Sequence, residues 1–161
     1  MTTRPTVSVD VHNASRETEL PNDEQIGQWV SAALQSAGAS CTNVELSVRF
    51  VGESEGRDLN GQYRGKDQAT NVLSFPFGEM AGLPKGGVQM LGDLVLCAPV
   101  VTQEATAQGK AAADHWAHLV VHGTLHLLGH DHIEDQEAAR MEALETSILR
   151  SFGIENPYSA N

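Results

Sequence analysis

Three histidines near the C-terminal third of the chain carry the clearest chemical signal. His122 and His126 lie four residues apart, so a helix would place their imidazoles on one face. Gly129 can end that helix and turn the chain back, which would bring His132 to the other two rings. Three neutral imidazoles around a vacant fourth position are typical of a catalytic zinc site. We therefore expect one zinc ion per chain, bound by His122, His126 and His132.

The spacing HxxxHxxGxxH is also that of the metzincin metallopeptidases. In those enzymes a glutamate follows the first histidine and acts as general base, whereas Gly123 stands at that position here. The chain thus has the metal ligands without the group that activates water and protonates a leaving amine. Because three neutral ligands leave zinc its full double positive charge, the site suits an anionic substrate such as a phosphodiester. A zinc metallopeptidase or another zinc hydrolase stays as the alternative.

Two more histidines lie on the same predicted helix. His115 and His118 share an arc with the two histidines of the last turn, and most other positions there are apolar. The helix should therefore be largely buried, where a histidine without a partner would be costly. We expect His115 and His118 to be core residues or to support the ligands, since only the last turn can reach past Gly129.

The rest of the sequence predicts the elements that must position this helix. Strand patterns occur at about 7–11, 44–50, 70–75 and 88–97. Helical patterns occur at about 22–38, 53–63, 99–108, 111–128 and from 135 onward, the last with Met141, Leu144, Ile148 and Phe152 spaced to pack on the core. We expect one α/β (α+β) domain over residues 1–161, with helices packed on a four-stranded mixed sheet. The metal-binding helix should be central because it is the most apolar.

The charge pattern limits the kind of nucleic-acid binding that is expected. A net charge of −11 argues against a protein that coats nucleic acid, which requires many contacts from lysine and arginine to phosphate. A nuclease with a local positive pocket is still compatible with it. Clusters of charge are usually solvated surface. The basic cluster is Arg49, Arg57, Arg64 and Lys66, and the acidic one is Glu134, Asp135, Glu137, Glu142 and Glu145.

Nothing in the sequence indicates export or a membrane span. Residues 1–15 lack a basic segment followed by an apolar one, and the longest apolar run, 94–101, is short and contains Pro99. Cys41 and Cys97 are too few for a disulfide framework. We expect a cytoplasmic protein with reduced thiols and no membrane partner.

Three segments, in this order, resemble the YbeY family of bacterial endoribonucleases. They are LNGQYRGKDQATNVLSF at 59–75, LGDLVL at 91–96, and HGTLHLLGHDH at 122–132, which continues as HIEDQEAARMEALE to residue 145. The resemblance covers nearly the whole chain, and the combination is far more specific than any single motif. It implies a zinc-dependent endoribonuclease of ribosomal RNA maturation, notably at the 3′ end of the small-subunit RNA, and of ribosome quality control.

The resemblance also implies which residues and partners take part. His122, His126 and His132 match the ligands, and Arg64 matches an arginine that the family requires for function. Many relatives have tyrosine where this chain has His130, so the resemblance gives His130 no role. The implied partners are ribosomal RNA and the small ribosomal subunit, with ribosome-associated proteins as further candidates.

Physical roles follow for the residues around the histidines. Arg64 can present a planar fork to phosphate oxygens at every working pH, although a salt bridge to Asp67 is the alternative. Lys66 is a second candidate contact to phosphate. Asp93 and Asp131 could orient ligand histidines or could cap loops. The sequence names no general base, and it does not decide between zinc-bound water and the 2′-hydroxyl of RNA as nucleophile.

Single-stranded RNA is the expected substrate, because duplex binding needs an extended basic surface.

A third hypothesis is a ribosome-assembly factor that works chiefly by binding, with a metal that only holds the fold. The acidic charge fits this hypothesis, since a weak RNA binder would need protein partners. The vacant fourth position of the metal site argues against it.

Overall fold

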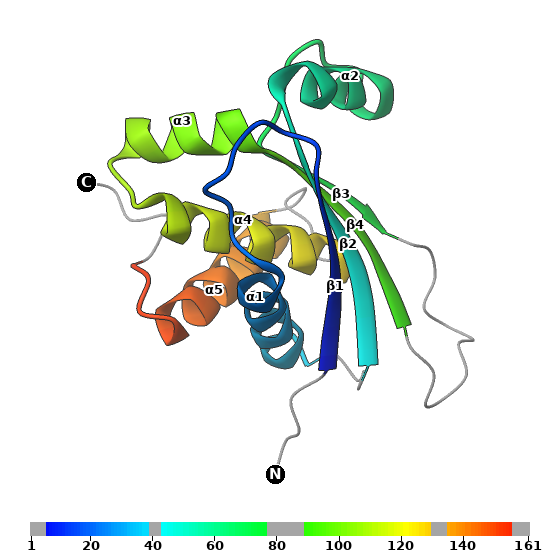
Figure 1. Ribbon diagram of the computed structural model, residues 1–161. Coiled ribbons are helices and arrows are strands. Elements are labelled where there is room, and N and C mark those ends of the chain that lie inside the picture. The colour runs from blue at the N-terminus through cyan, green and yellow to red at the C-terminus, as the bar shows by residue number, and fades with distance from the viewer. Residues whose placement is uncertain (1–5, 39–42, 77–88, 130–134, 156–161) are drawn as a thin grey trace.

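The computed structural model describes residues 6–38, 43–76, 89–129 and 135–155 (Figure 1). The strands are β1 (Thr6–Asn13), β2 (Asn43–Val51), β3 (Val72–Pro76) and β4 (Gln89–Cys97). The helices are α1 (Asp23–Ser36), α2 (Glu53–Arg64), α3 (Ala98–Gln108), α4 (Ala112–Leu127) and α5 (Asp135–Ser151). Each predicted element is present, with its bounds within two residues of the expected ones.

The strands form a mixed sheet in the order β1-β2-β4-β3. β1 pairs in parallel with β2, and β2 in parallel with β4, while β3 runs antiparallel to β4 at the edge. The parallel pair β1 and β2 is joined by α1, which Asn22 begins with a capping box closed by Gln25. The four-stranded mixed sheet and the α+β class predicted from the sequence are confirmed.

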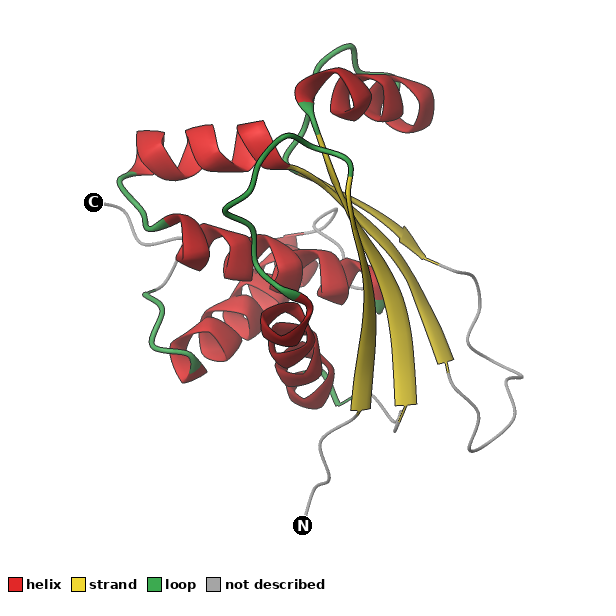
Figure 2. Ribbon diagram, in the orientation of Figure 1, coloured by secondary structure: helices red, strands yellow, loops and turns green. Residues whose placement is uncertain are grey.

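Helix α4 lies at the centre of the helical layer, as Figure 2 shows. It contacts β3 and β4 on the sheet and α1, α3 and α5 around it. Trp116 of α4 meets Phe50 of β2 edge to face, with ring centroids 5.3 Å apart. Since α4 is packed on several sides, its polar side chains can be held in fixed positions. The prediction of a central, largely buried helix is confirmed.

One core prediction for α5 is wrong. Met141 and Ile148 are buried as expected, but Phe152 is 37% exposed. Helix α5 ends at Ser151, and Gly153 has a φ of 77°, so helical spacing no longer applies to Phe152.

Among the helices that the structure describes, none is both long enough and apolar enough to cross a bilayer.

Candidate metal centre and substrate cleft

The end of α4 brings two of the predicted ligands together. The helix stops at Leu127, and Gly129 has a φ of +100°, a conformation that glycine adopts at little cost. The predicted glycine stop is therefore confirmed. The third proposed ligand, His132, and the neighbouring His130 and Asp131 lie outside the described residues.

The rings of His122 and His126 face each other in a way that suits a shared ion. Their Nε2 atoms are 3.1 Å apart. Two nitrogen ligands on one tetrahedral zinc ion would be separated by about 3.3 Å, given metal–nitrogen distances of about 2.0–2.1 Å. Both side chains are half-buried, which leaves the pair open on one side. The donor set thus fits two ligands of a zinc ion.

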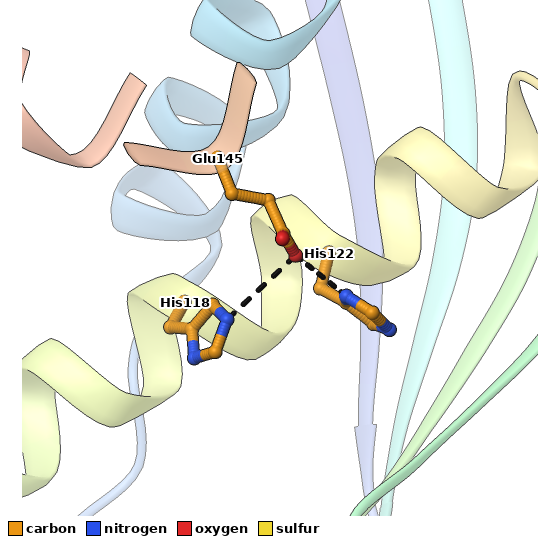
Figure 3. A group of neighbouring side chains, drawn as sticks. All are labelled: His118, His122 and Glu145. Carbon is orange, nitrogen blue, oxygen red and sulfur yellow. Dashed lines mark hydrogen bonds and ion pairs between the residues drawn. The ribbon is translucent and has the colours of Figure 1, made fainter. Parts of the chain in front are cut away.

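A buried carboxylate stands behind His122 (Figure 3). Glu145 reaches from α5 and is 0% exposed, and its Oε1 lies 2.5 Å from Nδ1 of His122. The same oxygen is 3.6 Å from Nε2 of His118. One ligand atom from each of these three residues lies within 4.8 Å of the others. His118, His122 and Glu145 therefore form a candidate metal-binding cluster in the described part of the chain.

Sequence reasoning missed Glu145, although a signal was present. Glu145 belongs to the acidic cluster of the C-terminal segment, which the sequence predicts to be solvated, yet it follows Met141 by four positions and precedes Ile148 by three. It therefore lies on the same buried face of α5 as those two residues. A carboxylate inside an apolar stripe is the pattern that could have identified it.

The suggestion that Asp93 orients a ligand histidine is wrong. Leu94 faces α4 and contacts the position of Gly123. Because neighbouring side chains of a strand point to opposite faces, Asp93 points away from α4, and it is exposed. Glu145 occupies the position beside His122 instead.

Gly123 allows α4 to approach the sheet closely. A Cβ atom at this position would lie 2.7 Å from Cδ2 of Leu94 and 3.3 Å from Oγ of Ser74. The hydroxyl of Ser74 also donates to the carbonyl of Gly123, with a distance of 3.4 Å. A side chain at the position that holds glutamate in metzincins would therefore require the buried Leu94 side chain to shift.

Replacing Gly123 with alanine should lower the free energy of unfolding. Overpacking a filled core costs about 1–3 kcal/mol, and alanine returns about 1 kcal/mol of helix preference, so we expect a net loss of about 1 kcal/mol. Gly27 of α1 is the matched control, because its Cβ would have only ordinary contacts at 3.9 Å. Gly27→Ala should raise stability by up to about 1 kcal/mol. Urea unfolding measures both, and an equal gain in the two variants would contradict the close approach at Gly123.

His115 is a core histidine with its own hydrogen-bonded partner. It is 4% exposed, and its Nε2 lies 2.9 Å from Oε1 of Glu104. Nδ2 of Asn71 donates to the same oxygen, with a distance of 3.0 Å. Burial lowers the pKa of His115, with the hydrogen bond to Glu104 acting in the opposite direction. This network ties the start of β3 to α3 and α4, which fits the expected core role of His115.

An open cleft of about 700 Å³ joins the histidines to the predicted arginine. Arg64 from α2 and the pair His122 and His126 from α4 line the same cleft, along the edge strand β3. The full lining is Tyr63, Arg64, Thr70, Asn71, Val72, Leu73, Ser74, Phe75, Pro76, His122 and His126. Residues some 60 positions apart in the sequence therefore meet at one concave surface.

Local interactions fix the end of α2 where Arg64 lies. Gly65 ends the helix with a φ of 70°, and the buried Asn60 donates to the carbonyl of Gln68, 2.6 Å away. The alternative partner of Arg64, Asp67, lies 3.9 Å from Arg57. Among the described residues, Arg64 has no ion pair and is exposed.

Two other basic residues of the sequence cluster, Arg49 and Lys66, do not line the cleft. Arg49 makes two hydrogen bonds to Glu55, of 2.7 and 3.2 Å, and hydrogen bonding to this carboxylate raises the pKa of Arg49. Lys66 is exposed and is not among the residues that line the cleft. Arg64 is thus the one arginine or lysine of the described chain that lines the cleft with the histidines.

Comparison with known proteins identifies the family. The family model described as Endoribonuclease YbeY matches residues 10–153. The chain belongs to the YbeY family. A protein named Endoribonuclease YbeY from Xanthomonas campestris pv. campestris (strain B100) is 53% identical over 154 residues, which cover 95% of this chain and 94% of that protein. One of the same name from Azoarcus sp. (strain BH72) is 51% identical over 159 residues, or 96% of this chain and 61% of that longer protein. The predicted family resemblance is confirmed.

A solved structure supports the fold independently. The solution structure of TM1509 from Thermotoga maritima matches with a TM-score of 0.57 and 21% sequence identity. The match covers 95% of this chain and all of that one. At this identity the likeness concerns the fold alone, and it agrees with the mixed sheet and central helix described above.

Proposed function

We propose that this chain is a zinc-dependent, single-strand-specific endoribonuclease that acts in ribosomal RNA maturation and in ribosome quality control. The observation that carries the proposal is the shared cleft, in which Arg64 lies with His122 and His126. Membership of the YbeY family supports the RNA substrate. The 3′ end of the small-subunit RNA, the small ribosomal subunit as partner, ribosome-associated proteins and a cytoplasmic location are further parts of the proposal.

His122, His126 and His132 would hold the zinc ion. When bound, the ion supplies a Lewis acid for a phosphoryl oxygen and lowers the pKa of water. The histidine pair of α4 is fixed by packing of that helix on several sides, so the ligand atoms need little rearrangement. Such rigid support is what a catalytic metal requires from its first ligands.

Arg64 would bind the non-bridging oxygens of the scissile phosphate. Its guanidinium is charged at every working pH and presents parallel donors that match two phosphate oxygens. Since no described side chain pairs with it, its donors are available to a ligand. Lys66 would contact a neighbouring phosphate outside the described lining of the cleft.

Aromatic side chains beside Arg64 support a preference for unpaired RNA. Tyr63 is 58% exposed, lines the cleft and meets Phe75 edge to face, with ring centroids 4.9 Å apart. A ring held in this way can stack on a base only if that base is not already stacked in a duplex. With a net charge of −11, the protein also lacks the basic surplus that favours duplex binding.

Gly123 supports RNA over peptide as substrate. Glycine supplies no carboxylate at this position, and a side chain there would displace Leu94. A phosphodiester leaving group needs less protonation than an amine, so the loss of this acid harms RNA cleavage less than proteolysis.

The strand preference gives the test of this proposal. Zinc-loaded protein should cleave a single-stranded RNA at least about tenfold faster than the same sequence held in a duplex, because only the unpaired strand can present a base to Tyr63. An unstructured protein substrate in the same buffer should stay intact. Equal rates on both RNAs, or proteolysis without RNA cleavage, would contradict the proposal.

A further inference from the structure

We infer that Glu145 is not a metal ligand but a positioning residue for one. It accepts a hydrogen bond from Nδ1 of His122 and so makes Nε2 of that ring the atom that binds the ion. His118 stands on the other side of the same carboxylate oxygen. This inference rests on the proposed metal site at the end of α4. It adds to that site the residue that fixes which nitrogen of His122 binds the metal.

The two nitrogens of His122 face different partners. Nδ1 lies 2.5 Å from Oε1 of Glu145, whereas Nε2 lies 3.1 Å from Nε2 of His126. A carboxylate can only accept a hydrogen bond, so Nδ1 must carry the hydrogen. A neutral imidazole then has its lone pair on Nε2, on the side of His126 and the cleft.

The distances distinguish this arrangement from a metal bound by Glu145 itself. Two ligand atoms of one tetrahedral zinc ion would be about 3.3 Å apart. The 2.5 Å between Nδ1 of His122 and Oε1 of Glu145 is much shorter than this and is a direct hydrogen-bond contact, which leaves no room for an ion between the two atoms. In the cluster of His118, His122 and Glu145, the carboxylate therefore orients the His122 ring, and the ion would bind on the opposite side of that ring.

The burial of Glu145 indicates that its hydrogen bond to His122 is more than an incidental contact between surface groups. Glu145 is 0% exposed, on the apolar face of α5 between Met141 and Ile148. A buried carboxylate is costly unless it is well paired, so an apolar residue would serve better if packing were the only task. Carboxylates that orient ligand histidines raise the affinity of the site for its metal.

Zinc affinity measured by chelator competition tests the inference without any RNA. Glu145→Gln should still bind one zinc ion per chain, with an affinity about 10–100-fold lower than that of the wild type. Glu142→Gln, one turn earlier on α5 and without a described contact to the histidines, is the matched control and should bind as tightly as the wild type. His126→Ala should lose stoichiometric zinc. An unchanged affinity in Glu145→Gln would overturn the inference, as would loss of zinc in that variant with full retention in His126→Ala.

A second measurement needs no variant and so does not depend on how a substitution folds. Long-range ¹H–¹⁵N spectra of the wild type should show His122 protonated at Nδ1, and added zinc should shift its Nε2. Zinc binding through Nδ1 would overturn the inference. Because both measurements concern the metal alone, a protein that meets them but fails to cleave RNA would contradict the proposed function and not this assignment.

Discussion

Replacing Arg64 with alanine should lower the rate of RNA cleavage by about 100-fold or more, which is a typical effect of removing one electrostatic stabiliser of a transition state. Zinc content and thermal stability should stay at wild-type values, because Arg64 is exposed at the end of α2 and makes no described ion pair. Single-turnover cleavage of a short single-stranded RNA, with zinc quantified in each preparation, measures the effect.

Two further variants separate the arginine fork from charge alone. Arg64→Lys should recover little activity, because a point charge does not replace two parallel donors. Arg57→Ala removes a neighbouring arginine of α2 that lies 3.9 Å from Asp67 and does not line the cleft. It should cleave RNA like the wild type. Full activity in Arg64→Ala, or equal losses in the two alanine variants, would show that Arg64 has no special role at the phosphate.

Loss of His126 should abolish both zinc binding and cleavage. With only two of the three proposed ligands left, His126→Ala should fall from about one zinc per chain to a small fraction of that value. Its activity should fall with its zinc content and should not return when zinc is added at the wild-type level. Metal analysis of the purified variant, followed by the same cleavage assay, gives the two readouts.

A second histidine variant controls for a general effect of losing an imidazole. His12 is exposed on β1, outside the lining of the cleft. His12→Ala should therefore keep its zinc and its activity. Stoichiometric zinc retained by His126→Ala would contradict the ligand assignment, whatever the activity of that variant.

Periodicity and backbone chemistry predicted the fold well because each signal is local. Alternating apolar residues marked β1 and β2, and helical spacing marked the first helix at about 22–38. Gly129 could be assigned as the helix stop because a residue at positive φ is needed there. The same local logic failed at Phe152, where the helix had already ended.

The site was harder to predict because it depends on which elements become neighbours. Helical spacing placed His122 and His126 on one face, but it could not show that α5 would place Glu145 behind His122. The sequence could not show that α2 would carry Arg64 to the same cleft either, because the family resemblance implied a functional role for Arg64 but not its position. Asp93 was misjudged because the face of β4 that meets α4 is set by the tertiary packing of Leu94. His132 lies outside the described residues, so its role stays a prediction.

One measurement tests directly whether the histidine site cleaves RNA in a metal-dependent way. Wild-type protein of known zinc content is incubated with single-stranded RNA as purified, after removal of zinc by a chelator, and after zinc is restored. We expect cleavage in the first sample, none above background in the second and recovery in the third, in proportion to bound zinc up to one ion per chain. RNA cleavage that is unaffected by complete removal of zinc would contradict this expectation.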